Sequence, residues 1–70
     1  MENNTKAMKL LDVPRGSMIR VIGNIIIPPE APSIHKGDIL KFSRIDGIYS
    51  ECFKDGERVY LGALTEVEII

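Results

Sequence analysis

The chain has 70 residues, of which 44% are hydrophobic and 27% are charged, and its formal net charge is −1. A chain of this length forms one domain and buries only about 60% of its unfolded surface, which leaves little room for a deep substrate cavity beside a core. The hydrophobic content argues against a disordered chain. The near-neutral charge argues against a dedicated duplex-binding module, because such modules are strongly basic.

The single cysteine, Cys52, cannot form an internal disulfide. The sequence shows neither a charged-then-apolar leader nor an apolar run long enough to span a bilayer. We therefore expect a protein of the reducing cytoplasm that does not insert into a membrane.

Residues 1–9 are mostly small and polar and follow no clear period, so we expect a flexible N-terminal arm followed by a single domain over residues 10–70. The first long strand is expected over residues 18–27. Gly23 lies in the middle of this strand, where glycine often marks a bulge or a sharp bend.

The segment over residues 28–36 begins with three of the four prolines and ends the first strand, because proline cannot donate to a central ladder. We expect it to be a stiff, polyproline-like loop. Three turn signals follow, in which glycine adopts a positive φ at no steric cost: Lys36-Gly37-Asp38, Asp46-Gly47 and Asp55-Gly56. The first turn precedes, and the other two separate, the strands expected over residues 38–45, 48–54 and 57–63. A short turn expected over Gly62-Ala63-Leu64-Thr65 then leads to the last strand, expected over residues 67–70.

The register of these strands follows from where the apolar residues must lie, since a slip of one residue moves every side chain to the other face. A two-residue turn at Asp55-Gly56 pairs Cys52 with Val59. An odd-length loop, with Asp46-Gly47-Ile48 as a turn plus a bulge, brings Phe42 onto the same face as Cys52. The predicted core is Ile19, Val21, Leu40, Phe42, Cys52, Val59, Leu61, Val67 and Ile69, with Ile25 or Ile27 added beyond the bend.

The stretch from Lys36 to Ile70 resembles a Src-homology-3-like barrel in the order and spacing of its motifs. Lys36-Gly37-Asp38-Ile39-Leu40 is similar to the strand after that family's diverging turn, and Asp55-Gly56-Glu57-Arg58 is similar to its distal turn. The resemblance implies an all-β, five-stranded barrel, a pattern shared by many functions. The family's first peptide-binding tryptophan is Ile48 here, so recognition of proline-rich peptides is not expected.

Two further resemblances concern the biological role. Residues 28–32, 46–52 and 65–68 look like segments of short, mostly uncharacterised proteins of tailed bacteriophages, which implies an accessory protein in the cytoplasm of an infected bacterium. Residues 11–16 and 67–70 resemble FeoA-type barrels of bacterial ferrous-iron transport, which implies a regulatory barrel acting on a transporter.

The residues that could carry catalysis or hold a metal have simpler structural roles. Cys52 and His35 are the only thiol–imidazole pair, but Cys52 falls on the predicted core face, where a free cysteine behaves as a small hydrophobe. Structural zinc needs four Cys or His ligands, and the chain has one of each. Glu66 and Glu68 alternate outward as a solvated strand face should. We therefore expect no catalytic residue, no metal and no cofactor.

The best functional candidate is an outward row of aromatic side chains. In the predicted register Tyr49, Phe53 and Tyr60 share one face, with Glu51 and Arg58 between them. Tyrosine is favoured at binding surfaces because its ring buries a large area while its hydroxyl keeps a polar partner. Either these rings bind a protein partner, or the proline loop or the N-terminal arm covers them.

Basic residues offer an alternative, since cations beside aromatic rings can bind single-stranded nucleic acid. Solvated strand charges would explain the same residues. The candidates for an RNA or single-stranded DNA site are Arg20, Lys41, Arg44 and Lys54, beside Arg58.

We therefore expect a non-enzymatic interaction module that binds a protein partner through Tyr49, Phe53 and Tyr60. Arg58 and the proline loop, including Pro29, would rim this surface. A homo-oligomer is possible through an unprotected strand edge at the C-terminal end.

Overall fold

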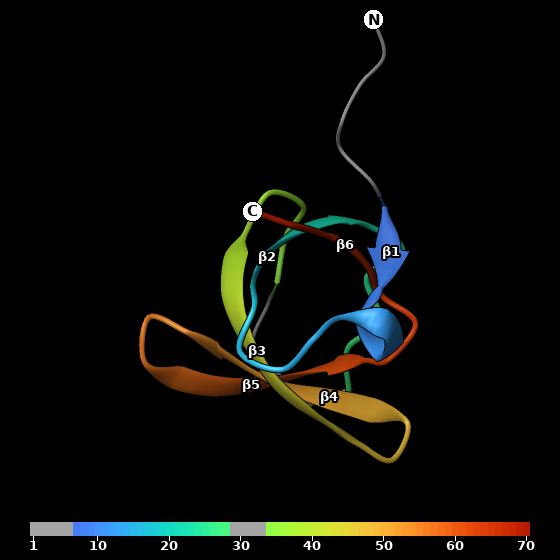
Figure 1. Cartoon of the computed structure of the whole chain (residues 1–70), viewed down its shortest axis with the longest axis vertical. Coiled ribbons are helices and arrows are strands. Elements are labelled where there is room, and N and C mark those ends of the chain that lie inside the picture. Colours follow the sequence, from blue (N-terminus) through green and yellow to red (C-terminus); the bar gives the residue numbers. More distant parts are fainter. Residues whose placement is uncertain (1–6, 29–33) are drawn as a thin grey trace, which may run out of the picture.

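The computed structural model describes residues 7–28 and 34–70, which form one antiparallel sheet of six strands (Figure 1). The elements along the chain are β1 (Met8–Lys9), the 3₁₀ helix η1 (Leu10–Asp12), β2 (Met18–Gly23), β3 (Ile39–Asp46), β4 (Tyr49–Lys54), β5 (Glu57–Gly62) and β6 (Glu66–Ile69). The strands are ordered β1-β6-β2-β3-β4-β5, and no pairing within the described residues joins β1 to β5. The fold is therefore all-β, as expected, but the sheet is open rather than closed.

Strand β1 adds one strand to the expected five. Met8 pairs with Val67 and Lys9 with Glu66, so these two residues belong to the sheet and not to an arm. The N–H of Leu10 continues the contact by donating to the carbonyl of Thr65 at 3.1 Å. A two-residue strand is too short to show a period, which is why the sequence did not reveal it. Residues 1–6 of the expected arm lie outside the described residues.

Strand β2 ends at Gly23, four residues earlier than expected, and the register shifts between Val21 and Gly23. The bulge predicted at this glycine is therefore confirmed. The next residue, Asn24, has a φ of 46°, a left-handed conformation that asparagine tolerates better than most residues and that turns the chain out of the sheet. Residues 29–33 of the proline-rich segment, including Pro29, lie outside the described residues.

Both predicted hairpins are present. Asp55 and Gly56 have φ values of 53° and 85°, as a two-residue type I′ turn requires, and Cys52 pairs with Val59. Phe42 pairs with Cys52, so the predicted face was right. The extra residue was misplaced, however. Gly47 and Ile48 form a tight two-residue turn, and the irregularity lies between Phe42 and Arg44 instead.

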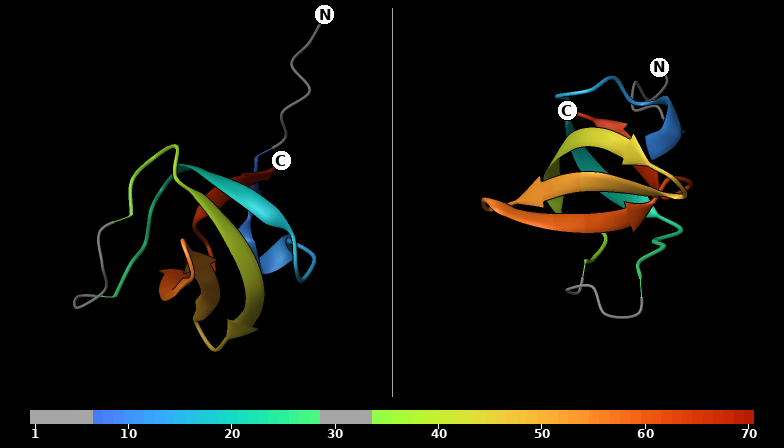
Figure 2. Two further views of the ribbon diagram at one scale, coloured as in Figure 1. Left: turned by 90° about the vertical axis from the view of Figure 1, so that its left-hand side faces the viewer. Right: turned by 90° about the horizontal axis from the view of Figure 1, so that it is seen from below.

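The core fills the inner face of the curled sheet, and Figure 2 shows β3, β4 and β5 side by side as one wall of it. Eight of the predicted core residues are buried: Ile19, Val21, Leu40, Phe42, Cys52, Val59, Leu61 and Val67. The prediction that Ile69 belongs to the core was wrong. Ile69 pairs with Ile19 but is 44% exposed, because it is the last residue of β6. Ile25 and Ile27 both pack partly buried against the core.

Four buried apolar residues were not predicted to be in the core, and all lie outside the long strands: Leu10, Val13, Ile34 and Ala63. The turn expected over residues 62–65 is present, with the N–H of Thr65 donating to the carbonyl of Gly62 at 3.0 Å. Among the described residues no helix has the length and apolar character needed to cross a bilayer.

Candidate functional site

The outer face of β3, β4 and β5 carries its side chains in three cross-strand rows. The pairing places together Asp46, Tyr49 and Gly62 in the first row, Arg44, Glu51 and Tyr60 in the second, and Lys41, Phe53 and Arg58 in the third. The register thus brings Tyr49, Phe53, Tyr60 and Arg58 onto one face. Each of the three rings is half-buried, and Arg58 is exposed.

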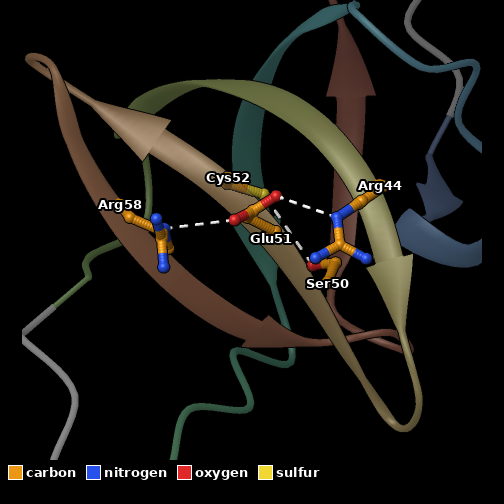
Figure 3. A network of polar contacts seen from close by, with 5 residues as sticks. All are labelled: Arg44, Ser50, Glu51, Cys52 and Arg58. Carbon is orange, nitrogen blue, oxygen red and sulfur yellow. Dashed lines mark hydrogen bonds and ion pairs between the residues drawn. The ribbon is translucent and has the colours of Figure 1, made fainter.

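Glu51 lies at the centre of these rows and is only 8% exposed, although a solvated position was expected for it. The Nε of Arg44 donates to its Oε1 at 3.1 Å, and the Nε of Arg58 lies 3.1 Å from its Oε2 (Figure 3). Side chains from both neighbouring strands surround Glu51. A carboxylate can be buried at low cost only when cations or hydrogen-bond donors satisfy it. An acidic residue on a central strand with arginines on both neighbouring strands was the signal that could have identified this ion-paired cluster.

The basic residues of the nucleic-acid alternative do not form one strip. The Nη1 of Arg20 lies 2.6 Å from the Oε2 of Glu68, on β2 and β6. The Nζ of Lys54 lies 3.0 Å from the Oδ2 of Asp38, at the far end of β4. Glu68, for which an outward, solvated position was predicted, is nearly buried in its ion pair. These carboxylates offset much of the positive charge that a nucleic acid would need.

Asp38 also shapes the turn before β3. Its Oδ2 accepts a hydrogen bond from the backbone N–H of His35 at 2.9 Å as well as from Lys54. Both bonds lower the pKa of the Asp38 carboxyl below its usual value, and the bond from the His35 N–H has the larger effect. A turn-capping role accounts for this aspartate without any chemistry.

Cys52 has no nucleophilic character in this fold. It is fully buried, and burial raises the pKa of its thiol to about 11 despite the nearby Ser50 hydroxyl, 3.8 Å from its Sγ. The thiolate is the reactive form, so the thiol is inert near neutral pH. His35 lies exposed in the turn before β3. Within residues 7–28 and 34–70, no group of three or more His, Cys, Asp or Glu residues could hold a metal ion.

The feature that the sequence analysis missed is an apolar pocket of about 400 Å³ beside Tyr49. Its lining residues are Leu11, Ile26, Gly47, Ile48, Tyr49, Gly62, Ala63 and Leu64. Four of them are large apolar side chains that remain exposed, Leu11, Ile26, Ile48 and Leu64, and Ile48 is 77% exposed. Exposed apolar side chains gathered around one hollow mark an interaction site far better than scattered ones do.

The pocket walls come from four chain segments, and residues 62–64 are hydrogen-bonded to the other three. The N–H of Leu11 donates to the carbonyl of Ala63 at 2.9 Å, and the N–H of Ala63 donates to the carbonyl of Ile48 at 2.9 Å. The N–H of Gly62 donates to the carbonyl of Ile26 at 2.5 Å. This backbone network holds the walls of the pocket together.

Apolar residues inside turns were the sequence signal for this pocket. Ile48 is the second residue of the Gly47-Ile48 turn, and Leu64 lies in the turn between β5 and β6, where solvated polar residues are usual. A second pocket of about 420 Å³ shares Ile26 and Leu64 with the first, but its other lining residues include Lys9, Asn24 and Glu66. It is more polar, so we place the candidate site in the apolar pocket.

Comparison of the chain with known proteins finds no matching family model, no matching curated protein and no matching solved structure. The basis for assigning a function is therefore the surface itself.

Proposed function

We propose that this chain is a non-enzymatic interaction module that binds a protein partner through the apolar pocket and the adjoining ring of Tyr49. The observation that carries the proposal is the gathering of Leu11, Ile26, Ile48 and Leu64, all exposed, around one hollow. Burial of apolar surface contributes about 25 cal/mol per Å², so the complex with a partner that fills the pocket is stabilised in proportion to the apolar area removed from water. Phe53 and Tyr60 extend the same surface.

We also propose a Src-homology-3-like architecture and a bacteriophage origin for this chain. The two hairpins and the turn after β5 occur in the order expected for a Src-homology-3-like barrel, which supports an open variant of that architecture. The resemblance of residues 28–32, 46–52 and 65–68 to phage proteins supports an accessory role in the cytoplasm of an infected bacterium. With a patch this small, we expect an affinity on the order of micromolar, about −8 kcal/mol.

Affinity purification from a bacterial lysate tests the proposal. Three full-length baits are compared: the wild type, the pocket variant Ile48→Asp and the matched control Ile39→Asp. Ile39 is an exposed isoleucine on β3 outside the pocket. We expect mass spectrometry to identify a protein captured by the wild type and the control but not by the pocket variant. Equal capture by both variants would contradict the proposal.

Single-stranded nucleic acid is a second candidate, favoured by the placement of Lys41, Arg44 and Arg58 on one face with Phe53 and Tyr60. Binding of this kind weakens steeply with salt because counterions are released. A fluorescence-anisotropy titration of a labelled oligonucleotide at two salt concentrations tests it: salt-sensitive binding lost in Arg44→Gln supports this candidate, and no binding at either concentration contradicts it.

A further inference from the structure

The apolar pocket and the ion-paired cluster around Glu51 are neighbouring parts of one surface. Tyr49 and Gly62 line the pocket, and they pair with each other across β4 and β5. Glu51 and Tyr60 form the next row on the same face, two residues along each strand. Two residues of a strand span about 7 Å, so the cluster begins one side-chain spacing from the pocket.

The cluster carries more positive than negative charge. Two guanidinium groups, of Arg44 and Arg58, meet the single carboxylate of Glu51, and each arginine uses its Nε for that contact. Within the described residues no hydrogen bond engages the Nη groups of either arginine, and both side chains are exposed. Because Glu51 already restrains both planar groups, they lose less conformational freedom when they bind a second anion.

We propose that the occupant of this surface is an extended segment of a protein partner that carries an apolar side chain and a carboxylate two or three residues apart. The apolar side chain fills the pocket, and the carboxylate binds the Nη groups of Arg44 and Arg58. This inference rests on the proposed function and names the chemistry of the partner. A phosphate backbone is disfavoured because the anchoring site is apolar and the chain as a whole has a net charge of −1.

Selection of binders from a random twelve-residue peptide library, with the full chain as bait, tests the inference. Peptides that are enriched by the wild type and not by Ile48→Asp are then synthesised, labelled and titrated by fluorescence anisotropy. We expect them to share an apolar residue and an Asp or Glu at the stated spacing. Replacing that acid with Asn or Gln in the peptide leaves the protein untouched and is expected to weaken binding about tenfold.

A double-mutant cycle links the acid to the two arginines. In the Arg44→Gln/Arg58→Gln variant the acid-to-amide change in the peptide should have little further effect. The matched control is Arg20→Gln, which breaks an arginine–glutamate pair on β2 and β6, away from this face, and should keep the full tenfold difference. Circular dichroism establishes that each variant is folded.

The outcomes separate the inference from the proposed function. Peptides that require Ile48 but tolerate loss of the acid would keep the interaction module and overturn the acidic partner. A twelve-nucleotide single strand that binds through Arg44 and Arg58 more tightly than any selected peptide would also overturn it. If no peptide is enriched over the Ile48→Asp bait, both the proposed function and this inference fail.

Discussion

Gly62 and Ile26 approach so closely that no side chain fits between them. A Cβ built on Gly62 would lie 2.6 Å from both the Cβ and the Cγ2 of Ile26, and the N–H of Gly62 donates to the carbonyl of Ile26. The N–H of Ile26 in turn donates to the Oγ1 of Thr65 at 3.1 Å. One glycine at the end of β5 therefore holds one wall of the apolar pocket in place.

Gly62→Ala should displace Ile26 and destabilise the domain. Overpacking at a site where backbone and a branched side chain must move costs about 1–3 kcal/mol. Gly23→Ala is the control, because its Cβ would meet only the Oε1 of Glu66 at an ordinary 3.5 Å. Urea unfolding measures both, and equal stabilities for the two variants would contradict the close packing.

Leu10 and Leu11 are adjacent in sequence but have opposite roles. Leu10 is 0% exposed and belongs to the core, whereas Leu11 is 54% exposed and lines the pocket. Leu10→Ala should lower the free energy of unfolding by about 2–5 kcal/mol. Leu11→Ala should change it by less than about 0.5 kcal/mol, as most exposed substitutions do. Thermal and urea unfolding test the pair, and similar losses for the two would show that η1 does not dock as described.

Glu51→Gln should destabilise the sheet, because it leaves the guanidinium groups of Arg44 and Arg58 facing each other across a neutral amide. Since both arginines are exposed and screened by solvent, we expect a loss of about 1–2 kcal/mol. The control is Glu57→Gln, an exposed glutamate on β5 for which the described residues provide no ion pair. Urea unfolding at low salt compares the two, and a cost no larger than that of the control would refute a stabilising cluster.

The buried thiol predicts a loss of stability at alkaline pH. The pKa of Cys52 is raised from 9.0 to about 11 by burial, so the unfolded chain gives up this proton before the folded chain does. The contribution of the thiol is fully present below about pH 9 and is lost as the pH rises toward 11, by roughly 2–3 kcal/mol. The free energy of unfolding, measured from pH 8 to 11, should fall more steeply for the wild type than for Cys52→Ala, since the two chains differ only at this residue. Parallel curves would contradict a buried neutral thiol.

Turn chemistry and alternation in the sequence are sufficient to predict which faces of β3, β4 and β5 point inward, but not where the irregularity of β3 lies. The Asp55-Gly56 turn and the need to bury Phe42 with Cys52 specify which face of each strand points inward, and the pairing agrees. The irregular parts could not be predicted in the same way. Leu10, Val13 and Ile34 are buried by long-range contacts that leave no local period, and β1 is only two residues long.

In the candidate site, too, the features that depend on local alternation could be predicted, and those that depend on long-range contacts could not. Register placed Tyr49, Phe53 and Tyr60 on one face correctly, because period-2 alternation is a local property. The pocket beside them joins residues 11, 26, 48 and 64, which meet only when η1 and the segment after β2 dock on the turn between β5 and β6. The burial of Glu51 likewise depends on neighbours from two other strands.

Chemical-shift mapping tests the central claim most directly. The ¹⁵N-labelled chain is titrated with the best peptide from the library selection, and amide shifts are followed by nuclear magnetic resonance. We predict the largest changes at the pocket segments, residues 26, 47–49 and 62–64, with little change at Arg20 and Ile39 on the opposite part of the sheet. Changes concentrated on β2 and β6, with the pocket amides unmoved, would contradict the account.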